Sequence, residues 1–148
     1  MEKIDHLSLD KSQTELIEAA ISLRKMAYCP YSNFKVGAAL RDDAGDIHNG
    51  CNIESSDYTL TTHAEMLAID SMVKSRVGAK IQSLAVALSS KSGYPLPCGL
   101  CRQKIAEFSD GDVIVYGVNL DELGLVSDIF KTSLNELYPF SFNAINLE

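Results

Sequence analysis

The chain has 148 residues, of which 46% are hydrophobic and 22% charged, a composition typical of a folded globular protein. Its net charge of −7 disfavours a nucleic acid polymer as partner, because such binding depends largely on cations that pair with phosphates. The sequence has no apolar run long enough to cross a membrane, and its first 20 residues carry charges throughout. We therefore expect a cytoplasmic protein with no membrane partner and no secretory signal.

Capping patterns and hydrophobic periodicity predict the elements in chain order. Ser12–Glu15 and Thr62–Glu65 both have the form of a capping box, and apolar residues follow each at helical spacing. Between them, two apolar runs flank a turn of Asp, Ala and Gly residues, which predicts a β-hairpin. The predicted elements are a helix from 12 that ends before 29, strands at 35–41 and 47–51, a helix from about 63, a strand at 83–88, a helix at 100–108, a strand at 113–118 and a short helix at 134–138.

After the hairpin, strands alternate with helices, which is the pattern of β-α-β units in a layered α/β fold. The chain shows no internal repeat and no linker-like stretch, so we expect one domain over residues 1–148. On this prediction, His63 and Cys98 both lie where a loop enters a helix.

Two of the four cysteines lie in the segment Pro97-Cys98-Gly99-Leu100-Cys101. In a reducing compartment such cysteines are more often ligands, nucleophiles or core residues than disulfides. Thiolate and imidazole are ligands that Zn²⁺ prefers, and C-x-x-C spacing lets two sulfurs reach one ion. Three protein ligands would leave a position for water, as in catalytic zinc sites. We therefore predict one zinc ion per chain, held by His63, Cys98 and Cys101.

Glu65 lies two residues after His63. In the middle of a helix the two side chains would point about 200° apart, but at the first turn both can face one pocket. There Glu65 would take a proton from a water molecule that zinc has made acidic. Each residue alone has an ordinary explanation: Glu65 as a helix cap, His63 as a surface or core histidine, the cysteines as a redox pair or half of a structural zinc site. We favour the catalytic arrangement because one geometry accounts for all four.

The pattern His63-Ala64-Glu65 followed by Pro97-Cys98-x-x-Cys101 matches the known signature of zinc-dependent deaminases. Around it, the chain resembles the small, single-domain cytidine deaminases over most of its length. The resemblance implies hydrolytic deamination of cytidine and 2′-deoxycytidine to uridine and 2′-deoxyuridine. It also implies a three-layer α/β/α sandwich around a mixed, mostly parallel sheet of about five strands. The matching segments are 28–32, 34–40, 50–54, 63–65, 97–103, 136–139 and Phe142.

The same resemblance implies roles outside the metal motif. Asn52 and Glu54 match the pair that binds the ribose hydroxyls, and Phe34 matches the ring that packs on the pyrimidine. An amide and a carboxylate at positions i and i+2 of a strand face the same side, which suits two neighbouring hydroxyls. Without the resemblance, Asn52 and Glu54 would be interpreted as a polar strand end, and Phe34 as an ordinary core phenylalanine.

Four further residues match contacts of the family with the base or between subunits. The backbone of Ala64 and of Cys98 lies where the family contacts the base. Tyr58 and Phe142 match aromatic residues that help to complete a pocket at subunit contacts. From these shared pockets we expect a homotetramer.

Two positions, His63 and Met66, depart from the family pattern. The single-domain relatives usually carry Cys where His63 stands, followed after one residue by Glu and then Arg, whereas here Met66 follows Glu65. Three thiolates leave a zinc site with a net negative charge, which an adjacent Arg can offset. One imidazole and two thiolates make the site formally neutral, so Met66 is compatible with a working enzyme.

Two other functions remain open. A deaminase of an antibiotic nucleoside of the blasticidin type is disfavoured, because the Asn52 and Glu54 pair suits an unmodified ribose. A non-enzymatic structural zinc module would need a fourth protein ligand. The residues that could supply it are His6, Cys29, His48 and Cys51.

Overall fold

The computed structural model describes residues 1–91 and 93–143. Its elements are β1 (Glu2–Ile4), the 3₁₀ helix η1 (His6–Ser8), α1 (Lys11–Arg24), β2 (Val36–Asp42), β3 (Ile47–Cys51), α2 (Ala64–Ser75), β4 (Ile81–Leu88), α3 (Gly99–Glu107), β5 (Ile114–Leu120), β6 (Val126–Ser133) and α4 (Leu134–Leu137). Within this described part, no helix combines the length and the apolar character needed to span a bilayer.

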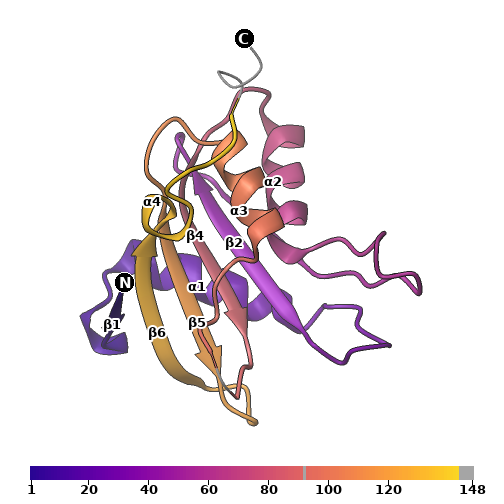
Figure 1. Cartoon of the computed structure of the whole chain (residues 1–148). Helices are drawn as coiled ribbons and strands as arrows, with labels where there is room; N and C mark the ends of the chain where they lie inside the picture. Colours follow the sequence, from indigo (N-terminus) through magenta and orange to yellow (C-terminus); the bar gives the residue numbers. More distant parts are fainter. Residues whose placement is uncertain (92, 144–148) are drawn as a thin grey trace.

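The strands form one mixed six-stranded sheet in the order β1-β6-β5-β4-β2-β3 (Figure 1). Only the pair β4 and β5 is parallel among the described strands, and every other neighbouring pair is antiparallel. The expectation of a mostly parallel sheet is therefore wrong. The prediction fails because β2 lies between β3 and β4 and is antiparallel to both. The strands that α2 connects, β3 and β4, are therefore parallel to each other but do not pair.

A second reason is β6, which the sequence did not predict. Apolar and polar residues do not alternate regularly along Val126–Ser133, which includes Asp128 and Lys131, so the segment lacks the pattern of a half-buried strand. It follows β5 across a turn at Gly124, whose φ of +79° suits glycine, and returns antiparallel to β5. β1 then pairs with β6 at the edge of the sheet.

Helices cover both faces of the sheet, which confirms the layered α/β/α architecture (Figure 1). α1 packs on one face, while α2 and α3 pack side by side on the other. Successive side chains of β4 point to opposite faces of the sheet and so enter the hydrophobic core on each face. Ala85 and Ala87 face α1, whereas Leu84 and Val86 face α2 and α3. The buried residues that the helices contribute are Leu16, Ile17 and Ala20 from α1, Ala68, Ile69 and Met72 from α2, and Ile105 from α3.

A row of small residues crosses the sheet beneath the amino ends of α2 and α3. The register pairs Gly50 with Ala38, Ala38 with Val86, and Val86 with Gly117. A Cβ on Gly50 would lie 2.5 Å from the Ala64 carbonyl oxygen, so only glycine lets α2 begin this close to β3. Gly50 therefore allows α2 to begin close to the sheet, and Gly117 does the same for the loop that leads into α3.

The helix caps differ in detail from the prediction. α1 begins with a capping box two residues earlier than expected, in which Asp10 accepts from the Gln13 N–H at 2.8 Å and Gln13 accepts from the Asp10 N–H at 3.0 Å. The N-cap of α2 is His63, and no side chain caps this helix start. Glu65 is therefore not engaged in a capping box with Thr62 and is left to face the interior.

Candidate active site

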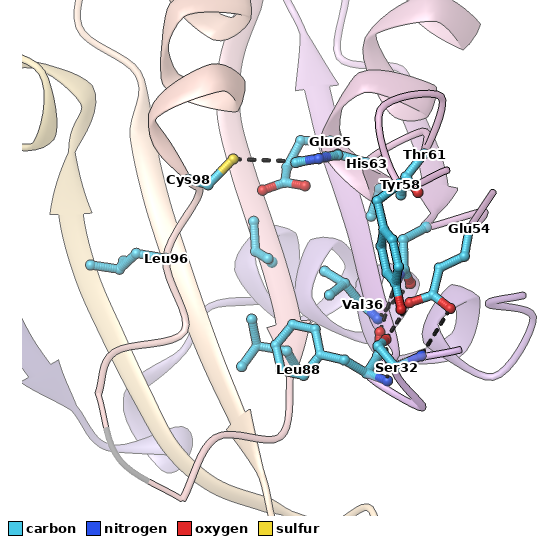
Figure 2. Close-up of a pocket in the computed structure, with 14 residues that line it drawn as sticks. Ser32, Val36, Glu54, Tyr58, Thr61, His63, Glu65, Leu88, Leu96 and Cys98 are labelled. Carbon is cyan, nitrogen blue, oxygen red and sulfur yellow. Dashed lines mark hydrogen bonds between the residues drawn. The ribbon is translucent and has the colours of Figure 1, made fainter. Parts of the chain in front are cut away.

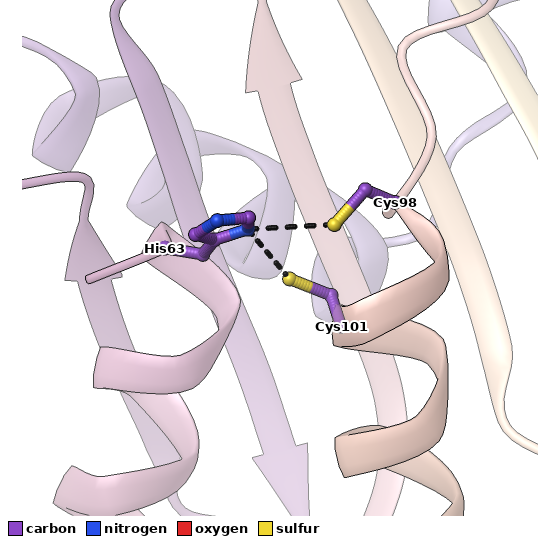
Figure 3. Close-up of side chains that lie close together, drawn as sticks. All are labelled: His63, Cys98 and Cys101. Carbon is purple, nitrogen blue, oxygen red and sulfur yellow. Dashed lines mark hydrogen bonds between the residues drawn. The ribbon is translucent and has the colours of Figure 1, made fainter. Parts of the chain in front are cut away.

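The three predicted zinc ligands meet where α2 and α3 begin. His63 is the N-cap of α2, Cys98 is the N-cap of α3, and Cys101 lies in the first turn of α3. Figure 3 shows the His63 ring directed at both sulfurs. Its Nδ1 atom lies 3.4 Å from the Cys98 Sγ and 3.3 Å from the Cys101 Sγ.

These distances fit a tetrahedral zinc ion. With Zn–N bonds of about 2.1 Å and Zn–S bonds of about 2.3 Å, a ligand nitrogen and a ligand sulfur stand about 3.6 Å apart. All three ligand atoms lie within 4.8 Å of one another, and among the described residues this is the one group of three or more potential ligands that could share an ion. His63, Cys98 and Cys101 thus form a zinc-binding site.

The other candidate ligands lie elsewhere in the described structure. Cys29 and Cys51 pack against Ala27 in a small buried cluster of their own. His48 is bonded through Nε2 to the buried carboxylate of Asp42 at 3.1 Å. His6 belongs to η1 near the start of the chain. Within the described residues the site therefore has three protein ligands, which is the open arrangement of catalytic zinc sites.

Glu65 lies beside this metal site, buried and turned toward the adjoining pocket (Figure 2). Burial raises the pKa of the Glu65 carboxyl above its ordinary value. Burial, and next the negative charge of Glu65, also raises the pKa of the Cys101 thiol. Because metal ligation requires the thiolate, a bound cation must displace the proton from Cys101.

A cavity of about 440 Å³ opens next to the metal ligands and is lined by residues from several elements (Figure 2). It brings together most of the residues that the sequence singled out, which are Phe34, Asn52, Glu54, Tyr58, His63, Ala64, Glu65 and Cys98. Cys101 lies behind them, fully buried at the start of α3. Residues far apart in the chain therefore line one pocket beside the metal ligands.

Asn52 and Glu54 line this pocket and also hold the loop that carries Phe34. The Asn52 Oδ1 accepts from the Val36 N–H at 2.8 Å, and its Nδ2 donates to the Phe34 carbonyl at 2.8 Å. Glu54 accepts from the Ser32 hydroxyl and from two backbone N–H groups of residues 31–32, at 3.0 and 3.2 Å. The Ser32 hydrogen bond is the main reason that the pKa of Glu54 is lowered.

Phe142 is the one predicted pocket residue that does not line the cavity of its own chain. Its side chain is exposed, and its carbonyl oxygen accepts a hydrogen bond from the Gln103 side chain at 2.8 Å. The structure thus places Phe142 against α3 rather than beside the other predicted residues.

Six lining residues lie outside the predicted set. Val86 and Leu88 are on the face of β4 that packs against α2 and α3, so strand alternation could have found them. Ser32 belongs to the segment 28–32 that carried part of the resemblance. Val36, at the start of β2, belongs to the segment 34–40 that also carried the resemblance, whereas the other two lie on loops where nothing local in the sequence indicates a pocket. The six are Ser32, Val36, Thr61, Val86, Leu88 and Leu96.

Known proteins are similar in sequence to this chain along most of its length. A cytidine deaminase from Sporosarcina psychrophila is 41% identical over 133 residues, which cover 90% of this chain and 93% of the relative. A cytidine deaminase from Halalkalibacterium halodurans is 40% identical over 129 residues, which cover 87% of this chain and 92% of the relative.

Solved structures share the fold as well. The crystal structure of cytidine deaminase from Burkholderia pseudomallei matches with a TM-score of 0.77 at 35% identity, covering 94% of this chain and 100% of that one. The cytidine deaminase from Mycobacterium tuberculosis matches with a TM-score of 0.70 at 29% identity, covering 90% of this chain and 99% of that one.

Residues 10–117, which include all three zinc ligands, match the family described as the cytidine and deoxycytidylate deaminase zinc-binding region. The matched region, the relatives and the open three-ligand site agree with one another. The chain belongs to the cytidine deaminase family, as a zinc-binding hydrolase.

Proposed function

We propose that this protein is a single-domain enzyme that hydrolyses cytidine and 2′-deoxycytidine to uridine and 2′-deoxyuridine, with release of ammonia. The observation that carries the proposal is the position of Glu65. This carboxylate is buried and lines the same pocket as His63 and Cys98 of the three-ligand zinc site. A proton-transfer residue next to an open metal position is the arrangement that hydrolytic deamination needs.

The chemistry follows from the groups around the pocket. When bound by His63, Cys98 and Cys101, zinc acts as a Lewis acid that lowers the pKa of a water molecule toward ~7. The Glu65 carboxylate accepts a proton from the water that attacks C4 of the pyrimidine. Glu65 then delivers this proton to N3 and carries the remaining proton of the C4 hydroxyl to the 4-amino group, so that the C4–N bond breaks, ammonia leaves and C4 becomes a carbonyl. Its burial keeps the carboxylate away from bulk water, which would compete for the proton.

We assign the base of the nucleoside to the metal end of the pocket and its ribose to the end lined by Asn52 and Glu54. Phe34 packs on the pyrimidine ring, while the backbone of Ala64 and of Cys98 contacts the base. Asn52 and Glu54 reach the ribose hydroxyls. After accepting from the Val36 N–H, the Asn52 Oδ1 keeps a second lone pair that can accept from a hydroxyl.

We also propose that four copies assemble into a homotetramer in the cytoplasm. Tyr58 and Phe142 expose 59% and 54% of their surface in the isolated chain, large apolar areas that a neighbouring copy would cover. In such an assembly Phe142 reaches the pocket of a neighbour instead of its own. The four free cysteines suit a reducing compartment, and the net charge of −7 suits a small substrate over a nucleic acid polymer.

The direct test is ammonia release from cytidine by the zinc-loaded chain, with 2′-deoxycytidine and blasticidin S measured in parallel. We expect turnover of both nucleosides and far slower turnover of blasticidin S. Faster turnover of blasticidin S would reassign the substrate, and zinc binding without turnover of any of the three would favour a structural zinc module.

A further inference from the structure

We propose that Arg102 is a positioning residue that fixes the zinc ligand Cys98 by joining the metal-binding loop to the C-terminal segment. Arg102 follows Cys101 in the first turns of α3. Its Nε donates to the Pro97 carbonyl at 2.7 Å, and its Nη1 donates to the Leu137 carbonyl at 2.9 Å. Its backbone N–H donates to the Cys98 carbonyl at 2.9 Å. One residue therefore holds the carbonyl groups on both sides of Cys98.

The loop before Cys98 is held from the sheet side as well. The Pro95 carbonyl lies against Gly117 of β5, where an added Cβ would stand 2.5 Å from the carbonyl oxygen. Residues 95–97 are thus confined between β5 below and the Arg102 side chain beside them. These contacts restrain the backbone that leads into Cys98.

The second contact of Arg102 reaches the end of α4, which is itself tied to α3. The Tyr138 hydroxyl donates to the Gln103 Oε1 at 2.9 Å, and the Gln103 Nε2 donates to the Phe142 carbonyl at 2.8 Å. Two consecutive residues of α3 therefore bind the C-terminal segment at three points. Because this segment is anchored, the Leu137 carbonyl gives the guanidinium a fixed second partner.

Arginine suits this position because its planar guanidinium directs two N–H groups to two acceptors at once. The single ammonium of lysine cannot occupy both positions, since its nitrogen is one point at the end of a flexible chain. Loss of groups that orient a metal ligand typically weakens metal binding by about 10–100-fold. We expect a loss of this size in Arg102 variants, through a faster release of zinc.

The test measures zinc release from the loaded chain into an excess of the chromogenic chelator 4-(2-pyridylazo)resorcinol. Arg102→Ala and Arg102→Lys should both release zinc about tenfold faster or more. The matched control is Lys104→Met, which removes a cation of the same helix that pairs with Asp70 of α2 at 2.5 Å. This control should release zinc at the rate of the unmodified chain.

A second readout separates positioning of the ligand from general loss of packing. In the Co²⁺-substituted protein, the thiolate-to-metal absorption band reports the geometry around the sulfurs. It should change in Arg102→Lys and stay unchanged in Lys104→Met. If Arg102→Ala does not fold, Arg102→Lys decides the outcome.

The inference rests on the zinc site of the proposed function but not on its substrate, and the two can fail separately. If the unmodified chain holds no zinc, the proposed function is wrong. If the unmodified chain holds zinc and Arg102→Lys releases it at the same rate with an unchanged cobalt spectrum, Arg102 has no positioning role.

Discussion

Glu65 can serve the reaction because of the position of one helix start. His63 is the last extended residue before α2, with φ −76° and ψ 151°, and Glu65 lies in the first turn of that helix. This change of backbone conformation between them lets both side chains face one pocket, which they could not do two residues apart in a continuous helix. The metal ligand and the proposed proton-transfer group are therefore placed by the same short segment.

Replacing Glu65 with Gln should abolish most of the turnover. The amide keeps the size of the side chain but cannot accept and deliver the proton, a function worth about 10²–10⁴ in rate. Zinc content and the melting temperature should stay close to those of the unmodified chain. Ammonia release under saturating cytidine measures the effect, with the exposed Glu107→Gln on α3 as control. Turnover by Glu65→Gln within tenfold of the unmodified chain would remove Glu65 from the mechanism.

Glu54→Gln should act chiefly on substrate binding. A hydrogen bond to a charged group contributes about 1.5–3 kcal/mol, so the loss should raise KM for cytidine by about 10–100-fold. Because Glu54 also holds residues 31–32, Ser32→Ala serves as the comparison that loosens this loop without removing the carboxylate. We expect a smaller rise in KM for Ser32→Ala. Equal effects of the two substitutions would mean that Glu54 acts through the loop and not on the ribose.

At the scale of elements, the site depends on how closely α2 approaches β3. Gly50 lies under the first turn of α2, and no side chain fits between the strand and the Ala64 carbonyl. The sequence predicted both elements, with β3 at the bounds observed and the start of α2 within one residue. Their close contact was not predictable, because it depends on long-range register and not on any local pattern.

Gly50→Ala should therefore displace the start of α2 and, with it, His63 and Glu65. Overpacking at such a contact costs about 1–3 kcal/mol of unfolding free energy, and turnover should fall along with it. Urea unfolding and ammonia release measure the two effects. Gly111→Ala is the control, because its added Cβ meets nothing within 4 Å. A Gly50→Ala variant as stable and active as this control would contradict the role assigned to the contact.

Asp42 joins the β2–β3 hairpin to the end of α2 and should make stability depend on acid pH. Burial acts to raise the pKa of Asp42, but hydrogen bonds from His48 and from backbone N–H groups of the hairpin turn outweigh it and lower the pKa. A carboxyl with a lowered pKa in the folded state stabilises the fold above its unfolded pKa of about 3.9. This contribution is lost as the pH falls through the lower, folded-state value.

Melting temperatures of the unmodified chain and of Asp42→Asn should therefore differ most near neutral pH and converge below about pH 4. Glu107→Gln, with its exposed side chain, is again the control and should show no such convergence. A constant difference between Asp42→Asn and the unmodified chain from pH 7 to pH 3 would show that ionisation of Asp42 does not support the fold.

At the scale of the whole molecule, the layers could be predicted but the sheet could not. Helical periodicity placed α1, α2 and α3, and these cover the two faces as expected. Which pairs are parallel depends on which strands become neighbours in the sheet. The local sequence does not indicate that β2 lies between β3 and β4. β6 was not predicted because its polar residues interrupt the alternation of apolar and polar residues that is typical of a strand. The metal site was predictable because its residue types and spacing are themselves the chemical signal.

Light scattering of the purified chain should give the mass of four copies, if neighbours cover Tyr58 and Phe142. Phe142→Ala should then lower turnover although this side chain does not line the pocket of its own chain. Tyr94→Ala, which removes another exposed aromatic ring packed on Phe130, is a control away from the pocket. A fully active monomer would contradict the assembly and the role of Phe142.

We propose that one zinc ion, held by three side chains, works together with Glu65. The most direct measurement is a titration of the metal-free chain with Zn²⁺ while ammonia release from cytidine is followed. We predict that activity rises linearly and saturates at one zinc per chain, and that Glu65→Gln binds the same single equivalent without gaining activity. Full turnover in the metal-free chain, or one bound equivalent with no turnover in the unmodified chain, would contradict the account.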